Sequence, residues 1–163
     1  MRIASATRMT QGLEVIAARW LFDIPESQIE VMIHRERIMP SLVEYQDRSM
    51  IAQLGLPDMR TPISYALRYP GRMPLDLPSL DLTEIATLTF CKPDHDRFPC
   101  LSLGYESLRI GGTMPATMNA ANEVAVEAFL NGGIQFTNIA EIIRSTMDRH
   151  IPKDFETLAD ALE

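Results

Sequence analysis

The sequence opens with a stretch whose residue types could bind a phosphate group and a divalent cation. Ser5 and Thr7 lie among small residues, and Glu14 follows about two turns further along if the stretch is helical. The first N–H groups of a helix have no partner within the helix, so they and nearby hydroxyl groups can bind an anion. Carboxylate oxygens are ligands that hard dications prefer. A simple helix cap followed by a solvated glutamate gives the same pattern, so spacing alone leaves both interpretations open.

The same stretch has the periodicity of an amphipathic helix. Apolar residues recur at spacings of four and three, which predicts one buried face made of Met9, Leu13, Ile16 and Trp20. Polar or small residues occupy a different face, made of Thr7, Gln11, Glu14 and Ala18. Helix is disfavoured at the residue before a proline, so Pro25 predicts that this helix ends near Asp23.

The composition argues against several classes of protein. A net charge of -7 over 163 residues is unlike that of a general nucleic-acid-binding protein, which carries a basic patch. The sequence has no apolar run of the roughly 20 residues that cross a bilayer. It also has no apolar signal-peptide core near its N-terminus. We therefore expect a cytoplasmic protein that binds neither nucleic acid nor membranes.

Neither the cysteines nor the histidines have the spacing of a metal site. Cys91 and Cys100 are the only cysteines and lie nine residues apart. A reducing compartment keeps such thiols free, so we expect two small buried side chains. Asp94-His95-Asp96 could bind a metal, but its position beside Pro93 is more typical of a polar loop.

After the first helix, the sequence has the alternation of a small, mostly antiparallel sheet. Apolar and polar residues alternate in a pattern that predicts strands over 28–34, 41–45 and 49–54. Residues 46–48 separate the last two strands and predict a hairpin turn. We expect the first helix to pack against this sheet, and a short helix to follow over 63–69.

A proline-rich segment divides the sequence into two parts. Four turn-forming residues crowd into nine positions, namely Pro70, Gly71, Pro74 and Pro78. Such a segment is typical of an extended linker. The residues at 83–90 beyond it favour a β-strand.

The remainder has the pattern of a helical bundle. Helices are predicted over 98–110 and 115–130, each ended by glycines. A third is capped by Thr137 or Asn138 and ended by Pro152, and a last one follows a cap at 154. Short helices joined by short loops form bundles. The polar residues on consecutive turns of the second helix are interpreted as a hydrogen-bonded seam between two domains: Asn119, Asn122 and Glu123.

These elements predict an α+β fold, with a helix on a small mostly antiparallel sheet, a proline-rich linker and a C-terminal helical bundle. The expected boundaries are 1–69 for the α/β part, 70–92 for the linker and 93–163 for the bundle. No glycine-rich turn between a strand and a helix is present, so no nucleotide-binding domain is expected in this chain.

Seven stretches in this order resemble the 1-deoxy-D-xylulose 5-phosphate reductoisomerase family. They run through almost the whole chain, so the resemblance does not depend on one short motif. The stretches are Ser5-Ala-Thr-x-Met-x-x-Gly-Leu-Glu14, Ala18–Phe22, Tyr45–Asp47, Ala52–Gly55, Pro57–Pro62, Pro99–Leu101 and Asn119–Glu123.

The resemblance implies an oxidoreductase of the non-mevalonate pathway of isoprenoid biosynthesis. The family rearranges 1-deoxy-D-xylulose 5-phosphate, a phosphorylated sugar, and reduces the product to 2-C-methyl-D-erythritol 4-phosphate with NADPH and Mg or Mn. Its homodimeric chains have a nucleotide-binding domain, a catalytic domain and a helical bundle. This sequence resembles part of the catalytic domain over 1–69, the linker and the bundle. We expect a fragment that is inactive alone; the alternative is a non-catalytic descendant that acts as a dimerisation or binding module.

Three residues match functional positions of the family. Ser5 matches a serine that holds the substrate phosphate. Glu14 matches a carboxylate of the metal site, and this match makes it both a metal ligand and a catalytic residue. Met59 matches a methionine that packs near the nicotinamide.

Other positions of the pocket depart from the family. Thr10 and Gln11 occupy the places of an asparagine and a lysine that contact the substrate. Gln11 loses the positive charge, and a charge-assisted hydrogen bond is about twice as strong as a neutral one. Arg37 and Pro40 occupy the places of a serine and a histidine, and Arg37 could restore the lost charge. Ala4 replaces an aspartate.

Overall fold

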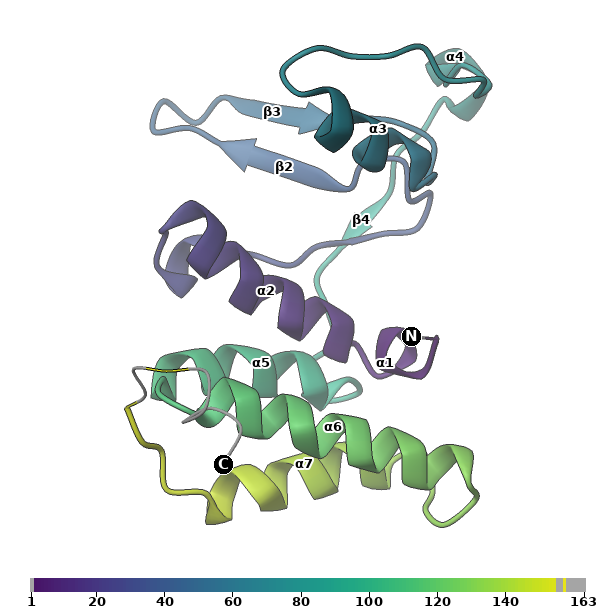
Figure 1. Ribbon diagram of the computed structural model, residues 1–163. Coiled ribbons are helices and arrows are strands. Elements are labelled where there is room, and N and C mark those ends of the chain that lie inside the picture. Colours follow the sequence, from purple (N-terminus) through teal and green to yellow (C-terminus); the bar gives the residue numbers. More distant parts are fainter. Residues whose placement is uncertain (1, 155–156, 158–163) are drawn as a thin grey trace. The chain divides into compact units, whose positions relative to one another are not determined.

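The computed structural model describes residues 2–154 and 157, and its contacts divide the chain into two compact units. One unit is Met1–Val31 together with Pro93–Glu163, and the other is Met32–Lys92. The first is helical, and the second contains two small sheets and two helices (Figure 1). In the described part of the chain, no helix is long and apolar enough to cross a membrane.

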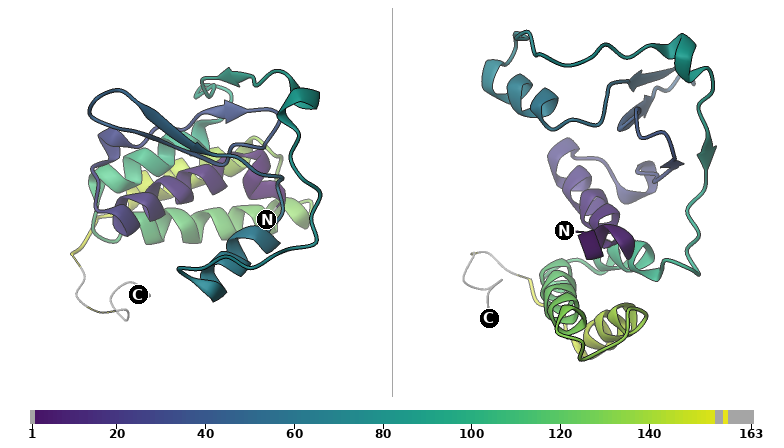
Figure 2. Two further views of the ribbon diagram at one scale, coloured as in Figure 1. Left: turned by 90° about the horizontal axis from the view of Figure 1, so that it is seen from above. Right: turned by 90° about the vertical axis from the view of Figure 1, so that its right-hand side faces the viewer.

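The helical unit is a bundle built from segments at both ends of the sequence. Its elements are α1 (Arg2–Ala6), α2 (Met9–Phe22), the 3-10 helix η1 (Glu26–Gln28), α5 (Pro99–Ile110), α6 (Met114–Leu130) and α7 (Asn138–Arg149). The views in Figures 1 and 2 show α2 alongside α5, with α6 and α7 beyond it. The three predicted helices of the bundle are confirmed. The predicted last helix lies outside the described residues, apart from its cap at 154.

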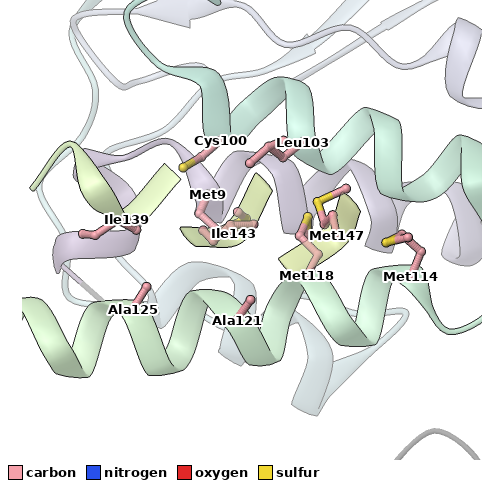
Figure 3. Close-up of a cluster of buried hydrophobic side chains, with 10 residues drawn as sticks. All are labelled: Met9, Cys100, Leu103, Met114, Met118, Ala121, Ala125, Ile139, Ile143 and Met147. Atoms are coloured by element: carbon pink, nitrogen blue, oxygen red, sulfur yellow. The ribbon is translucent and has the colours of Figure 1, made fainter. Parts of the chain in front are cut away.

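The core of this unit is made of side chains from α2, α5, α6 and α7 (Figure 3). Ten buried residues form it: Met9, Cys100, Leu103, Met114, Met118, Ala121, Ala125, Ile139, Ile143 and Met147. Each large apolar side chain that is removed from water contributes roughly 1.5–3 kcal/mol. Methionine fills irregular gaps well because its side chain is unbranched and flexible. Met9 is the contribution of α2, so the first helix belongs to this core.

A backbone contact between α2 and α5 sets the packing of the first helix within the helical unit. A Cβ atom built on Gly104 would lie 2.5 Å from Cα of Gly12, so the two helices touch backbone to backbone. The buried residues of α2 are Met9, Gly12 and Val15, and within the helical unit α2 packs mainly against α5. Trp20, predicted to be buried, is 71% exposed. The other three residues of the predicted face belong to the core or pack against it: Met9, Leu13 and Ile16. The periodicity missed Gly12, because glycine carries no hydrophobic signal although it lies at the centre of the contact.

The second unit contains two separate two-stranded sheets. The strands β2 (Ser41–Glu44) and β3 (Met50–Gln53) form an antiparallel hairpin in which Val43 is the partner of Ile51. The predicted hairpin is therefore confirmed. The strands β1 (Ile33–His34) and β4 (Phe90–Cys91) form the other antiparallel pair. The helix α3 (Arg60–Arg68) starts three residues before its predicted position.

Two strand predictions in this unit were too long. The strand predicted over 28–34 is reduced to β1, because alternation of residue types cannot create a ladder where no partner strand lies. Within 83–90, the helix α4 (Leu82–Ile85) forms instead, since Asp81 Oδ1 accepts hydrogen bonds from the backbone N–H groups of Thr83 and Glu84 at 2.8 and 3.3 Å. This is the geometry of a helix N-cap.

The cysteines are free, as expected, but only one is buried. Cys100 lies in the bundle core, and burial raises the pKa of its thiol. Cys91 is exposed, contrary to the prediction. It lies on β4, which is only two residues long, and both residues of that strand are exposed.

The helix contact predicts that Gly104→Ala will destabilise the bundle. The added methyl group would meet the backbone of Gly12, which cannot move aside as a flexible side chain can. We expect the free energy of unfolding to fall by about 1–3 kcal/mol, measured by urea denaturation followed by circular dichroism. The control is Gly133→Ala, whose methyl group would lie 3.4 Å from the Ala128 carbonyl oxygen. Equal midpoints for the two variants would contradict the proposed close contact.

Candidate functional site

The predicted anion site lies at a break between two helices. Arg8 has a left-handed backbone conformation with φ of 66° and separates α1 from α2. Ser5 therefore lies at the end of α1 and not in front of a single long helix. Its hydroxyl oxygen is 3.4 Å from that of Thr10, in the first turn of α2. The fold thus brings together two predicted substrate-binding residues, Ser5 and Thr10.

Thr7, in contrast, is committed to the fold. It is buried, its hydroxyl group donates to the Ala4 carbonyl oxygen at 3.1 Å, and it accepts from the Met9 N–H at 3.4 Å. Gly12 N–H donates to the Arg8 carbonyl oxygen at 3.2 Å, which is the first bond of the helix. The N–H groups of Thr10 and Gln11 precede that bond, and N–H groups at such positions lack an acceptor within the helix. They are the donors that an anion could use.

Glu14 lies one turn beyond Thr10 on the same side of α2. Residues three and four apart share a helix face, so Thr10, Gln11 and Glu14 are neighbours. The side chain of Glu14 is exposed, yet partial desolvation raises the pKa of its carboxyl group. The side-chain oxygen of Gln11 is buried and has no hydrogen-bond partner among the described residues. This face therefore offers two hydroxyl groups, one carboxylate and one unpaired amide oxygen.

The remaining predicted residues belong to the second unit. Arg37 is exposed and has a positive φ of 58°, and Pro40 precedes β2. Met59 is 70% exposed and lies directly before α3. Asp58 and Arg60 flank it and form a salt bridge, with 2.8 Å between Asp58 Oδ2 and an Arg60 guanidinium nitrogen. Both residues lie in the Pro57–Pro62 stretch that carries the family resemblance, but the sequence had not predicted that they pair.

A second polar network that sequence reasoning missed joins β1 to β4. His34 Nδ1 lies 3.0 Å from both the Thr89 carbonyl oxygen and Glu36 Oε2, so it must carry the proton that it donates. The hydroxyl group of Thr89 donates to Glu36 at 2.7 Å, and this bond lowers the pKa of the Glu36 carboxyl group. Glu36 and Thr89 also line an open cavity of about 450 Å³. The partners are more than fifty residues apart in sequence, so no local signal could find them.

The other polar patterns form local contacts. His95 Nδ1 lies 2.9 Å from the Ser102 hydroxyl oxygen, and Asp94 accepts from the Arg97 N–H, so the predicted polar loop is confirmed. Within the residues described, no three His, Cys, Asp or Glu side chains are grouped as a metal site. Asn119 donates to Glu123 along α6 at 3.1 Å. The seam between domains stays a prediction.

The raised pKa of Glu14 predicts how Glu14→Gln changes stability with pH. The folded chain holds the carboxyl proton more tightly than the unfolded chain. The tighter binding of this proton favours the folded state. That contribution is present below the pKa that Glu14 has in the unfolded chain, and it is lost as pH rises through the higher pKa that Glu14 has in the folded chain. Glu14→Gln should therefore be as stable as the parent at neutral pH or slightly more so, within about 0.5 kcal/mol.

Urea midpoints at neutral and acidic pH test this expectation, and Glu127→Gln on α6 is the exposed control. The gain relative to the parent should disappear in acid, where Glu14 is protonated in both states. A variant that is less stable than the parent only at neutral pH would mean that the Glu14 carboxylate has a favourable partner.

Comparison with known proteins assigns the family. The family described as the DXP reductoisomerase C-terminal domain matches residues 54–163. The 1-deoxy-D-xylulose 5-phosphate reductoisomerase of Geotalea uraniireducens is 57% identical over 160 residues, which are 98% of this chain and 42% of the relative. That of Bacillus subtilis is 56% identical over 162 residues, covering 99% of this chain and 42% of the relative. The chain thus spans about two fifths of the length of these curated relatives.

Solved structures agree with the sequence relatives. The enzyme from Zymomonas mobilis in complex with NADPH matches with a TM-score of 0.94 and 47% identity, over 98% of this chain and 42% of that one. A DOX-P reductoisomerase in complex with NADPH, fosmidomycin and magnesium matches with a TM-score of 0.88 and 48% identity, over 90% of this chain and 36% of that one. The family and the fold class predicted from sequence are confirmed. The chain belongs to the 1-deoxy-D-xylulose 5-phosphate reductoisomerase family.

Proposed function

We propose that this chain supplies part of the substrate-binding and metal-binding face of a 1-deoxy-D-xylulose 5-phosphate reductoisomerase. The observation that carries the proposal is the hydroxyl pair of Ser5 and Thr10 at the start of α2, with Glu14 one turn further along. In this proposal, 1–69 belongs to the catalytic domain, 70–92 is the linker and 93–163 is the C-terminal domain. The work of the enzyme is the NADPH-dependent rearrangement and reduction of a phosphorylated sugar in the cytoplasm.

The phosphate of the substrate would bind at the break between α1 and α2. Ser5 and Thr10 donate through their hydroxyl groups, and the first N–H groups of α2 donate through the backbone. Gln11 contributes a neutral amide in place of a lysine, so it adds no charge-assisted bond. Arg37 is the cation that we propose as its replacement. Its side chain is exposed.

Glu14 is the right type of ligand for a divalent metal ion, but one carboxylate is too few to hold such an ion. Glu14 provides the oxygen donor that Mg or Mn prefers, yet a hard dication takes about six oxygen ligands. In the part of the chain that the structure describes, no three His, Cys, Asp or Glu side chains are grouped as a metal site. Glu14 would thus be one ligand, with the others supplied by the rest of the enzyme. A bound dication would polarise the substrate carbonyl group.

The nicotinamide would contact Met59, whose exposed thioether suits packing against a flat ring. The strands described in this chain form only two antiparallel pairs. A dinucleotide fold needs a parallel sheet with a glycine-rich turn, so NADPH would be held chiefly by another domain.

Reconstitution tests the proposed activity. The chain alone, with substrate, Mn and NADPH, should show no NADPH oxidation by absorbance. Joined to the nucleotide-binding part of the Geotalea uraniireducens relative, it should oxidise NADPH. In that assembly Ser5→Ala should raise the KM for substrate about 10- to 100-fold, since a hydrogen bond to a charged group contributes roughly 1.5–3 kcal/mol.

The control in this assay is Ser41→Ala, at an exposed serine of β2. Turnover by the chain alone would overturn the proposed dependence on another domain. A joined enzyme that binds substrate but never turns over would favour the alternative, a non-catalytic descendant that serves as a dimerisation or binding module.

We also propose that the chain forms a homodimer through the β2–β3 hairpin. Val43 and Ile51 are cross-strand partners on one face, and they are 54% and 62% exposed. Among the described strands, β2 and β3 pair only with each other, so both edges of the hairpin are open. A two-stranded sheet is marginally stable by itself, and open apolar edges associate readily. A second copy of the hairpin would cover this face.

Size-exclusion chromatography with light scattering tests the dimer. The parent chain should have twice its monomer mass, and Ile51→Glu should have the monomer mass, because a buried charge without a partner opposes association. Val124→Glu, at a 66% exposed position on α6, should remain dimeric. A monomeric parent, or an Ile51→Glu dimer as tight as the parent, would contradict the proposal.

A further inference from the structure

The residues on either side of Met59 are joined by an unusually complete set of side-chain hydrogen bonds. Asp58 Oδ1 accepts from the backbone N–H of Arg60 at 2.8 Å and from its Nε at 3.0 Å. Asp58 Oδ2 accepts from Arg60 Nη2 at 2.8 Å. The two parallel bonds to the guanidinium group form the fork geometry that is strongest between arginine and carboxylate. We call this pair the 58–60 clamp.

The clamp encloses the backbone of Met59 between its two ends. The Asp58 carboxylate accepts from the N–H of Arg60, the first residue of α3, and the Asp58 carbonyl oxygen accepts from the Thr61 N–H at 3.2 Å. The Met59 carbonyl oxygen accepts from the Ile63 N–H at 3.2 Å. Met59 is thus fixed in helical geometry, with φ of -65° and ψ of -18°. A rigid backbone determines the direction in which its side chain leaves the helix.

The clamp is anchored beyond α3 and persists across the physiological pH range. Arg60 Nη1 lies 3.5 Å from the Asp76 carbonyl oxygen, which belongs to the proline-rich segment. Hydrogen bonds from Arg60 lower the pKa of Asp58 to about 2, so the carboxylate stays charged under ordinary conditions. The nearest charged group after these two along the chain is Arg68, at the far end of α3.

An exposed apolar side chain held on a rigid support is costly unless something covers it. Met59 is 70% exposed, and a free loop would let it turn toward Ile63 or other apolar neighbours. Sites that need accurate geometry are built on residues whose supporting shell is locked by hydrogen bonds. The clamp provides such a shell for a residue that otherwise contacts little.

We propose that Asp58 and Arg60 are positioning residues, which hold Met59 in the direction that lets its thioether contact the nicotinamide ring of NADPH. This inference rests on the proposed function, because that function supplies the nicotinamide. It assigns a role to two charged residues that contact neither substrate nor metal in the proposal above.

The test uses NMR to measure the mobility of Met59 in this chain, and separately its response to NADPH in the chain joined to the nucleotide-binding part of the Geotalea uraniireducens relative, where NADPH can bind. In the parent, the backbone order parameter of Met59 should be near the rigid value of about 0.85, and in Asp58→Ala it should fall below about 0.6. Asp58→Asn keeps an acceptor for the Arg60 N–H and should give an intermediate value. Arg60→Lys keeps the charge but loses the fork, so it tests the clamp if Asp58→Ala fails to fold.

The matched control is Asp47→Ala. Asp47 also accepts from a backbone N–H two residues ahead, that of Ser49 at 2.9 Å, in a turn of the same unit. This variant should leave the order parameter of Met59 unchanged. In the joined form of the parent, NADPH should shift the Met59 methyl signal through the ring current of the nicotinamide, and the shift should be lost in Asp58→Ala and kept in Asp47→Ala.

The outcomes separate the two ideas. An unchanged order parameter in both Asp58→Ala and Arg60→Lys would overturn the clamp as a positioning device, whatever NADPH does. A parent whose Met59 signal ignores NADPH, with order still lost in the variants, would overturn the nicotinamide contact of the proposed function. In that case the clamp would be shown to support the structure of α3 alone.

Discussion

The backbone contact of Gly12 with Gly104 is the constraint on which the helical unit depends. Side chains normally hold packed helices 8–10 Å apart, whereas here a single Cβ atom on Gly104 would overlap the facing backbone. The contact fixes the rotation of α2, so Met9 points into the bundle core. The same rotation turns Thr10 and Glu14 away from α5. A packing requirement in the bundle therefore determines which face of α2 is free for chemistry.

The candidate site keeps polar groups of the right kind while its charge is reduced. The helix break at Arg8 gives Ser5 and Thr10 a shared position that a continuous helix would not have allowed. In the proposed site Gln11 is a neutral amide, and the described residues hold no group of three His, Cys, Asp or Glu that could form a metal site around Glu14. Hydroxyl and amide donors can recognise a phosphate by geometry. Their hydrogen bonds to it are weaker than the charge-assisted bond that a lysine would donate.

The second unit is held together differently from the bundle. Among its described residues, Ile38 is the one apolar side chain that is fully buried. Acidic side chains of this unit accept hydrogen bonds, local ones at Asp47, Asp58 and Asp81 and a long-range one from Thr89 at Glu36. These bonds lower the pKa values of the four carboxyl groups. A depressed carboxyl pKa contributes stability above the unfolded pKa that is lost as pH falls toward the folded value. A unit with so small a core is suited to being covered by another surface, in keeping with the exposed hairpin.

The sequence by itself determined what depends on local signals. Helix periodicity and glycine stops predicted α5, α6 and α7, the turn at 46–48 predicted the hairpin, and seven ordered stretches identified the family. It also named Ser5 and Glu14 as site residues, whose roles stay proposals. The sequence comparison interpreted Thr10 and Gln11 as departures from the family. It did not predict that the side-chain oxygen of Gln11 would be buried without a hydrogen-bond partner among the described residues.

Only the tertiary structure decided the features that join distant residues. Gly12 carries no hydrophobic signal, so the true buried face of α2 and the exposure of Trp20 emerged only when α5 was in place. The pairing of β1 with β4, and the His34 and Glu36 contacts with Thr89, link segments more than fifty residues apart. Periodicity reports what a residue prefers, whereas these contacts depend on which segments the folded chain brings together.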